Sequence, residues 1–193
     1  MTALNPDLAF ASQAAFRALM EAFARPGEIR KIRGVNAPAP LAPATAALVQ
    51  SLADYETPIW LDHPLADVPA VAEWIRFHTG APLVADSGEA AFALVADPNG
   101  MPDFARFALG SEEYPDRSAT VVVQIERFDG CSLNMEGPGI KTARSLAAEP
   151  LQANFVERLR ANRELFPRGI DLVLVAGEQV AALPRSLRVA MET

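Results

Sequence analysis

The stretch "MEGPGIKT" (residues 135–142) has the residue types of a phosphate-binding loop, because two glycines precede a lysine and a threonine. A Walker-type loop needs its second glycine directly before the lysine, so that successive backbone N–H groups converge on the phosphates. Here Ile140 separates Gly139 from Lys141, and Pro138 has no N–H to donate. Spacing and hydrogen-bond chemistry therefore both disfavour a nucleotide-binding loop.

The same stretch is typical of a tight corner. Gly137 and Gly139 can take the positive φ angles that other residues avoid, and Pro138 fixes its own φ. We expect this corner to end the strand "CSLNME" and to lead past Lys141 into sequence of helical character. Gly137, Gly139 and Lys141 remain candidates for a pocket or an interface.

No set of metal ligands stands out in the sequence. A zinc site needs three or four converging His, Cys or carboxylate ligands, whereas His63 and His78 stand in the separate stretches "LDHPL" and "RFHTG". A carboxylate site for magnesium stays open, although no acidic motif points to one. His78 falls near the C-terminus of an expected helix, where it could be held protonated by the helix dipole or shuttle protons. Cys131, the only cysteine, opens an apolar strand, so we expect a packed thiol rather than a nucleophile.

Two lysines and two arginines complete the candidates. A pyridoxal-phosphate enzyme needs a lysine for its Schiff base, and Lys31 and Lys141 are the only lysines. Neither has a convincing setting for that role, so we expect no cofactor. Arg25 in "ARPGE" and Arg185 in "LPRSL" stand beside prolines, so each guanidinium is rigidly mounted and could pair with a carboxylate or a phosphate. Ordinary salt bridges explain both arginines equally well.

The elements that would position these residues alternate between helices and strands. Apolar residues recur at three- and four-residue steps over residues 5–24, and "RPG" ends this expected helix. Further helices are expected over 42–55, from a cap at Asp67 to a stop at Gly80, and over 151–166.

Short strands are expected at 28–33, 57–62, 90–97, 119–126 and 169–177, and the last four of these stretches are mainly apolar. The runs 90–97 and 119–126 are typical of a sheet covered on both faces, so we expect them at its centre. The segment 98–118 between them is rich in Pro, Gly and acids and should be a surface loop. The tail 179–189 reads as a hairpin or an edge strand. We expect one α/β layered domain over residues 1–193, with a mixed sheet flanked by helices.

Composition narrows the class of protein further. The formal net charge of -7 and the presence of only two lysines leave no basic stripe for nucleic acid. Hydrophobic residues make up 50% of the chain and charged residues 21%, so apolar surface should be left for another subunit. A single cysteine excludes an internal disulfide, and no apolar run is long enough to span a membrane. A cytoplasmic protein without a membrane segment is expected.

An ordered series of unusual stretches is more informative than any single residue. In chain order they are "FRALMEAFARPGEI", "DYETPIWLD", "FHTGAP", "ALGSEEYPDRSATVVVQI", "LNMEGPGI" and "LFPRGIDLVLVAGEQVAALPRSLRV". This series closely resembles the PhnH family, the H subunits of the bacterial carbon–phosphorus lyase system, over almost the whole chain. Each piece alone is weak, but six pieces in the family's order make coincidence improbable.

The resemblance implies a non-catalytic subunit of phosphonate breakdown that forms a homodimer alone and works with the G, I and J subunits. That machinery, with an accessory L subunit, replaces the adenine of ATP with an alkylphosphonate to make a ribose 1-phosphonate 5-triphosphate. The later cleavage of the carbon–phosphorus bond belongs to the iron–sulfur J subunit. The resemblance also implies a fold similar to pyridoxal-phosphate transferases without their cofactor site, and its "GPGI" motif does not extend to Lys141.

Two other hypotheses remain open on the sequence. One is an independent enzyme acting on a phosphorylated or phosphonate small molecule, with Arg25, His78, Lys141 or Arg185 around a pocket. The other is a degenerate pyridoxal-phosphate enzyme. Both require these scattered side chains to converge in the folded chain.

Overall fold

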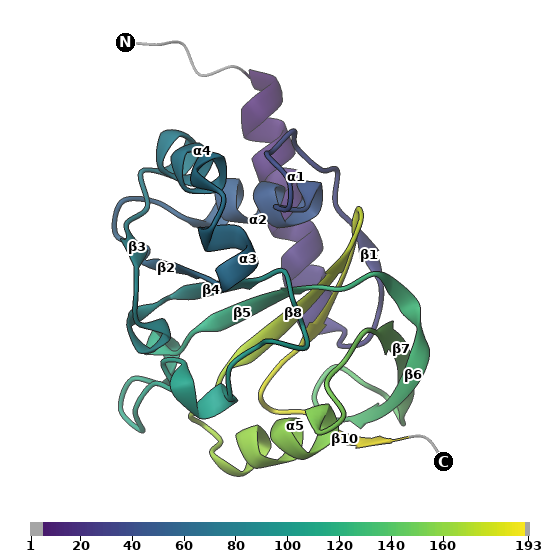
Figure 1. Cartoon of the computed structure of the whole chain (residues 1–193). Coiled ribbons are helices and arrows are strands. Elements are labelled where there is room, and N and C mark those ends of the chain that lie inside the picture. The colour runs from purple at the N-terminus through teal and green to yellow at the C-terminus, as the bar shows by residue number, and fades with distance from the viewer. Residues whose placement is uncertain (1–5, 192–193) are drawn as a thin grey trace.

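The computed structural model describes residues 6–191, which are built around a seven-stranded mixed sheet (Figure 1). The strand order is β1-β9-β8-β5-β4-β2-β3. These strands are β1 (Arg30–Lys31), β2 (Ile59–Leu61), β3 (Leu83–Val84), β4 (Phe92–Val95), β5 (Thr120–Gln124), β8 (Asp171–Ala176) and β9 (Gln179–Leu183). Strands β3, β2, β4, β5 and β8 run parallel, whereas β9 pairs antiparallel with both of its neighbours. The apolar runs expected at the sheet centre are β4 and β5, and they lie there.

Both faces of this sheet are covered, which explains why its strands are apolar throughout. Side chains alternate between the two faces along a strand. Val121 and Val123 of β5 therefore pack into one core, and Val122 between them packs into the other. A strand with a polar face would place unpaired polar groups in one of these cores, at a high energetic cost.

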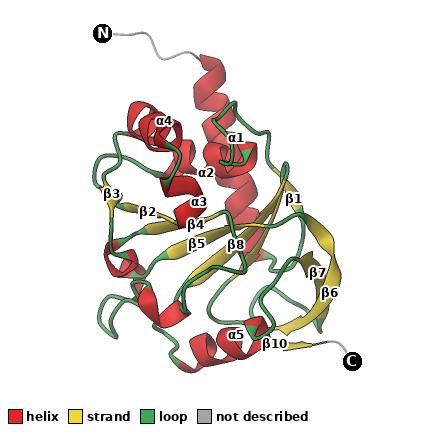
Figure 2. Ribbon diagram, viewed as in Figure 1, coloured by secondary structure: helices red, strands yellow, loops and turns green. Residues whose placement is uncertain are grey.

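Four helices cover one face of the sheet, as the ribbons in Figure 2 show. They are α1 (Pro6–Ala24), α2 (Pro43–Leu52), α3 (His63–Ala66) and α4 (Pro69–Thr79). Three of these helices pack into a shared core through Leu19 of α1, Leu48 of α2 and Ile75 of α4, each of which is at most 2% exposed. The helices expected over 5–24 and 42–55 are thus confirmed within the described residues.

The opposite face carries a smaller layer, in which the helix expected over 151–166 and the strand "CSLNME" are confirmed, whereas a separate antiparallel sheet was not predicted. This layer contains α5 (Phe155–Glu164) and a three-stranded antiparallel sheet of order β10-β6-β7. The strands are β6 (Arg127–Glu136), β7 (Arg144–Glu149) and β10 (Arg188–Met191). The expectation of helical sequence directly after the corner is wrong, because β7 follows it and α5 comes later. In β7 only Leu146 and Ala148 are buried, and this two-residue alternation is weak in an alanine-rich segment.

The segment 98–118 also differs from its expected place at the surface. Met101, Phe104 and Phe107 are at most 4% exposed and belong to the core beneath the sheet. The segment crosses from β4 to β5 through short 3₁₀ turns. These turns are η2 (Phe104–Arg106) and η3 (Pro115–Arg117), and a further 3₁₀ turn, η1 (Ser87–Glu89), precedes β4. The polar residues of segment 98–118 lie in its turns, whereas its three large apolar side chains pack into the core and hold the segment against the sheet.

The ends of the helices are mostly as expected, with one correction. Gly80 ends α4 with φ of 72°, a left-handed conformation that glycine adopts without strain. Asp67 does not cap α4, because Val68 takes the cap position without a side-chain hydrogen bond. Asp67 instead ends α3 and pairs with His63 at 2.9 Å. The tail 179–189 is also divided: β9 forms a hairpin with β8 inside the large sheet, and β10 is an edge strand of the small one.

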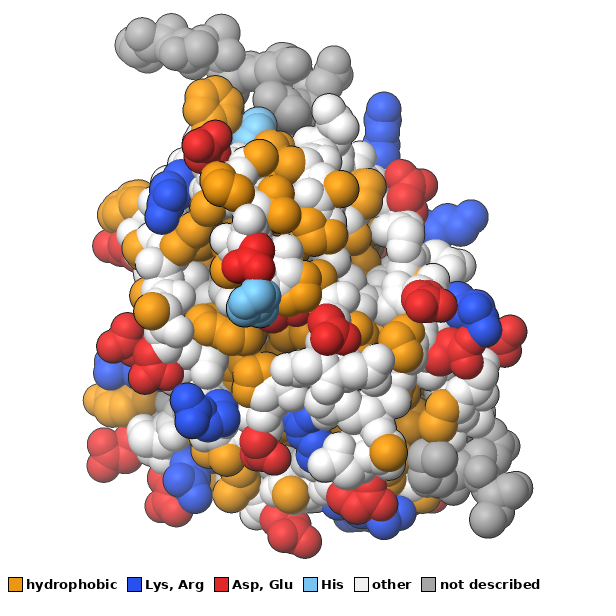
Figure 3. Space-filling view, viewed as in Figure 1, with side chains coloured by type: hydrophobic (Ala, Val, Ile, Leu, Met, Phe, Trp, Pro, Cys, Tyr) orange, Lys and Arg blue, Asp and Glu red, His pale blue; other side chains and the backbone are white. Residues whose placement is uncertain are grey.

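The surface is uneven in character. In the view of Figure 3, apolar side chains gather over the helical layer, whereas charged side chains lie mostly at its margins and over the lower half. Within residues 6–191, no helix is both long and apolar enough to cross a membrane.

Candidate functional site

A parallel sheet of this kind has one favoured place for a ligand. Ligands bind outside the carboxyl ends of the strands, where the chain leaves two neighbouring strands toward opposite faces. Here that place lies between β2 and β4. Strand β2 continues into α3 and α4 on the helical face, whereas β4 continues into the segment 98–118 on the other face.

The side chain of Asp62 bridges the ends of these two strands. Its carboxylate accepts hydrogen bonds from the backbone N–H groups of Ala96 at 2.7 Å, Asp97 at 2.9 Å and Leu65 at 3.3 Å. Asp62 is only 5% exposed. Burial raises the pKa of its carboxyl group, while the three N–H donors act in the opposite direction. The donors that could hold an anionic ligand at this point are therefore already occupied by the protein itself.

Sequence reasoning missed the role of Asp62, although a signal was present. Asp62 directly follows the buried strand β2 and precedes "HPL", so it is the N-cap residue of α3 with a proline in the first turn. The strand and helix patterns on either side identify the cap. They do not reveal that the same carboxylate also reaches across to β4.

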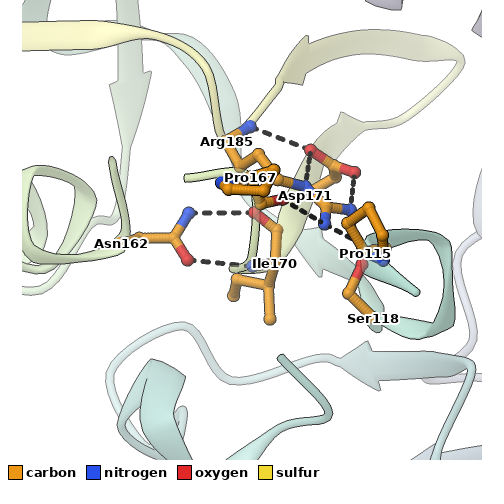
Figure 4. Close-up of polar contacts among 7 residues, drawn as sticks. All are labelled: Pro115, Ser118, Asn162, Pro167, Ile170, Asp171 and Arg185. Carbon is orange, nitrogen blue, oxygen red and sulfur yellow. Dashed lines mark hydrogen bonds and ion pairs between the residues drawn. The ribbon is translucent and has the colours of Figure 1, made fainter. Parts of the chain in front are cut away.

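Arg185, one of the sequence candidates, is held in a polar network between three segments (Figure 4). Its Nε donates to Asp171 Oδ1 at 3.2 Å, and a terminal nitrogen contacts Asp171 Oδ2 at 2.5 Å. The other terminal nitrogen donates to the carbonyl oxygens of Pro115 at 2.8 Å and Pro167 at 3.4 Å. A further hydrogen bond reaches the hydroxyl of Ser118. All five N–H donors of a guanidinium thus have partners in the protein, so Arg185 fastens the fold here.

A second polar contact lies beside this network in Figure 4. The side-chain amide of Asn162 donates to the carbonyl oxygen of Ile170 and accepts from its N–H, each at 2.9 Å. Asn162 is 3% exposed, so both amide atoms are satisfied inside the protein. This contact ties α5 to the start of β8 next to Asp171. The chain around Arg185 is therefore fixed from two sides.

The "GPGI" corner is a turn packed against the end of α1. Ile140 N–H donates to the carbonyl oxygen of Gly137 at 3.1 Å, and Gly139 has φ of 83°. A Cβ atom on Gly139 would overlap the carbonyl oxygen of Ala24, directly before Arg25. The corner predicted from the sequence is confirmed. Its second glycine serves close backbone packing in addition to the turn.

The neighbouring "ARPG" turn is held on the same small sheet. A Cβ atom on Gly27 would overlap the end of the Met135 side chain. Arg144 of β7 donates to the carbonyl oxygen of Pro26 at 3.2 Å and pairs with Glu28 at 3.0 Å. Two of the distinctive sequence stretches therefore form one junction between α1 and the small sheet.

The remaining sequence candidates lie apart from one another. Arg25 and Lys141 are both exposed near this junction. His78 is exposed in the last turn of α4, where its ring lies 4.3 Å from that of Trp74 and its Nδ1 lies 3.3 Å from the Gln50 side chain. The structure thus brings Arg25, Gly137, Gly139 and Lys141 to one region and leaves His78 and Arg185 elsewhere.

The larger cavities are lined by other residues. One of about 440 Å³ lies between η2 and α5, and it contains the 7% exposed side chain of Arg158. That guanidinium stacks 4.1 Å from the centre of the Phe104 ring and donates to the carbonyl oxygens of Met101 and Pro102. Burial lowers the pKa of Arg158, and Asp103 at 4.0 Å acts against this shift. Arg158 clamps the segment 98–118 onto α5.

The described part of the chain contains no assembled metal site and no thiol in a catalytic setting. No group of three or more His, Cys, Asp or Glu side chains there could hold a metal ion. Cys131 is half-buried within β6, opposite Ala148 of β7. The two lysines, Lys31 and Lys141, are both exposed on the surface. A Schiff-base lysine in a pyridoxal-phosphate enzyme is instead enclosed with the ring that it binds.

Comparisons with known proteins agree with the ordered motifs. The family model of the bacterial phosphonate metabolism protein PhnH matches residues 6–190. The chain is 44% identical over 188 residues to the α-D-ribose 1-methylphosphonate 5-triphosphate synthase subunit PhnH of Rhizobium meliloti (strain 1021), covering 96% of this chain and 94% of the relative. It is 32% identical over 181 residues to the putative C-P lyase subunit protein HtxG of Stutzerimonas stutzeri, covering 93% and 86%. The chain therefore belongs to the PhnH family of bacterial phosphonate metabolism proteins.

Proposed function

We propose that this chain is a non-catalytic subunit of a carbon–phosphorus lyase complex. In that role it is required for forming α-D-ribose 1-methylphosphonate 5-triphosphate from ATP and an alkylphosphonate. Family membership and the 44% identical synthase subunit support the pathway. The observation that carries the non-catalytic role is the crevice position between β2 and β4, where the backbone N–H donors of Ala96 and Asp97 are already taken by Asp62.

The proposal includes the assembly and the state of the chain. The partners are the G, I and J subunits of the same system, and the isolated chain forms a homodimer in the cytoplasm as a single domain over residues 1–193. The fold is similar to that of pyridoxal-phosphate transferases without a cofactor site. The exposure of both lysines supports the absence of a cofactor site. Absorbance near the Schiff-base band should therefore not appear when the chain is incubated with the cofactor.

Reconstitution of the complex tests the non-catalytic role directly. The G, I and J subunits are co-expressed with and without this chain, and formation of the ribose triphosphate product is followed. We expect product formation to be lost when the chain is omitted. Replacing Arg25, His78 or Lys141 by Ala should change the rate by less than about threefold, because loss of a true general acid or base costs about 100-fold or more. A 100-fold loss from one of these substitutions would assign catalysis to this chain.

The competing hypothesis of an independent enzyme is tested with the isolated chain. Its four candidates, Arg25, His78, Lys141 and Arg185, do not line the cavities of about 460, 440 and 610 Å³. We expect no turnover of phosphorylated or phosphonate small molecules by the chain alone. Turnover that is lost in Lys141→Ala would favour this enzyme over the subunit.

A further inference from the structure

A groove between α1 and β1 combines apolar walls with positive charge. Its volume is about 460 Å³. Ala15 and Ile32 form part of its floor and are at most 4% exposed, so the floor is continuous with the core. Lys31 and Arg33 stand exposed at its edge, and Phe10 forms a wall with 69% of its surface exposed. The groove can therefore enclose an apolar side chain next to two cations.

Helix α1 also exposes large apolar side chains on the side that faces away from the groove. Phe16 is 47% exposed and Met20 is 41% exposed, and they stand one helical turn apart. Large apolar side chains that remain exposed together are typical of protein interfaces, where they form the buried anchors. The groove and the exposed side chains that line it form what we call the α1 surface, made of Phe10, Lys31 and Arg33.

The N-terminal part of the chain, which holds the groove, is more basic than the central part. Residues 1–33 hold five Lys or Arg and three Asp or Glu, whereas residues 34–142 hold five and fifteen. Arg30 of β1 is paired with Glu21 at 3.7 Å and with Glu28. Within the described part of the chain, Lys31 and Arg33 form no ion pair. Two unpaired cations beside an apolar groove complement an acidic ligand with an apolar anchor.

We propose that the α1 surface docks an acidic, amphipathic segment of a partner subunit. An apolar side chain of that segment enters the groove beside Phe10, and its carboxylates pair with Lys31 and Arg33. Two cations on a chain of net charge -7 are too few for a nucleic-acid backbone, so a protein partner fits better. This inference rests on the proposed function, because it names the surface through which the subunit joins its complex.

Binding of purified variants to the co-expressed G, I and J subunits tests the inference. One variant combines Lys31→Glu with Arg33→Glu, and a second is Phe10→Ser. The matched control combines Arg76→Glu with Phe77→Ser on α4, where Phe77 is 85% exposed and Arg76 is also at the surface. All these side chains are exposed, so circular dichroism and the melting temperature should match the wild type.

The expected result is a loss of affinity of tenfold or more for both α1 variants, with the α4 control within twofold of the wild type. Binding of the wild type should also weaken with added salt, because exposed charge pairs are screened. If the α1 variants bind like the wild type, the inference falls and the proposed function stands. If the wild type itself does not bind, the proposed function falls and the inference with it. If the variants change only the mass of the isolated chain in light scattering, a second copy occupies the surface and the inference is overturned.

Discussion

The crevice between β2 and β4 and the α1 surface handle charge in opposite ways. In the crevice a buried carboxylate, Asp62, is satisfied by three backbone N–H groups of its own chain. On the α1 surface, Lys31 and Arg33 are exposed beside an apolar groove. A buried charge must be paired or hydrogen-bonded within the fold, because its desolvation is otherwise costly. An exposed charge is solvated by water, so it needs no partner within the fold and can bind another molecule. The difference supports the proposal that this chain acts through its surface instead of through an internal pocket.

The largest expected effect comes from removing Arg185. Arg185→Ala leaves Asp171 without its cation at a site where the aspartate side chain is only 21% exposed. Breaking a buried pair on one side costs about 3 kcal/mol of unfolding free energy, which urea denaturation would measure. The control is Arg76→Ala, an exposed arginine on α4 that should change stability by less than about 0.5 kcal/mol. Equal stability of the two variants would show that Arg185 is free for a ligand.

The second prediction concerns Asp62 itself. Asp62→Ala leaves the N–H groups of Leu65, Ala96 and Asp97 without their acceptor, so the unfolding free energy should fall by about 2 kcal/mol or more. Denaturant unfolding measures this loss. The control is Asp67→Ala, whose carboxylate is 61% exposed and should matter little. If Asp62→Ala keeps wild-type stability and gains affinity for phosphate, the crevice is a ligand site and the contrast drawn above is wrong.

The third prediction separates two reasons for a glycine at position 139, namely its positive φ and its close approach to Ala24. Gly139→Ala should cost about 2 kcal/mol of unfolding free energy, because it adds overlap with Ala24 to the strain of a positive φ. Gly177→Ala is the matched control, since Gly177 has φ of 58° and nothing within 4 Å of an added Cβ. It should cost only about 1 kcal/mol, the strain alone. Thermal unfolding of both variants would measure the difference, and equal costs would remove the role of close packing.

The smallest expected effect is a dependence on pH. Because burial raises the pKa of Asp62, the folded state binds this proton more readily than the unfolded state does. The contribution of Asp62 to the unfolding free energy should therefore increase as the pH falls from neutral toward the ordinary range of carboxyl groups. Asp62→Asn cannot titrate, so the stability of the wild type relative to this variant should rise over the same range. A difference that stays constant with pH would exclude the buried titration.

Much of the architecture follows from the sequence alone. The apolar runs 90–97 and 119–126 predict strands at the sheet centre, because only a strand buried on both faces is apolar at every position. The three- and four-residue periodicity of 5–24 predicts α1, and Gly80 predicts the end of α4. The "GPGI" corner is also decided locally, since its glycines permit positive φ angles and its proline fixes its own φ.

Only the tertiary structure decided which polar groups are used inside the fold. Arg185 meets Ser118 across 67 residues of chain, and Asp62 reaches the N–H groups of Ala96 and Asp97, which follow β4. Strand β7 also depends on its pairing with β6, because its own two-residue alternation is weak. Backbone angles and periodicity arise from neighbouring residues and can be read along the chain. The partners of a buried charge depend on which segments pack around it. These segments are distant in the sequence, so the local order of residues does not identify them.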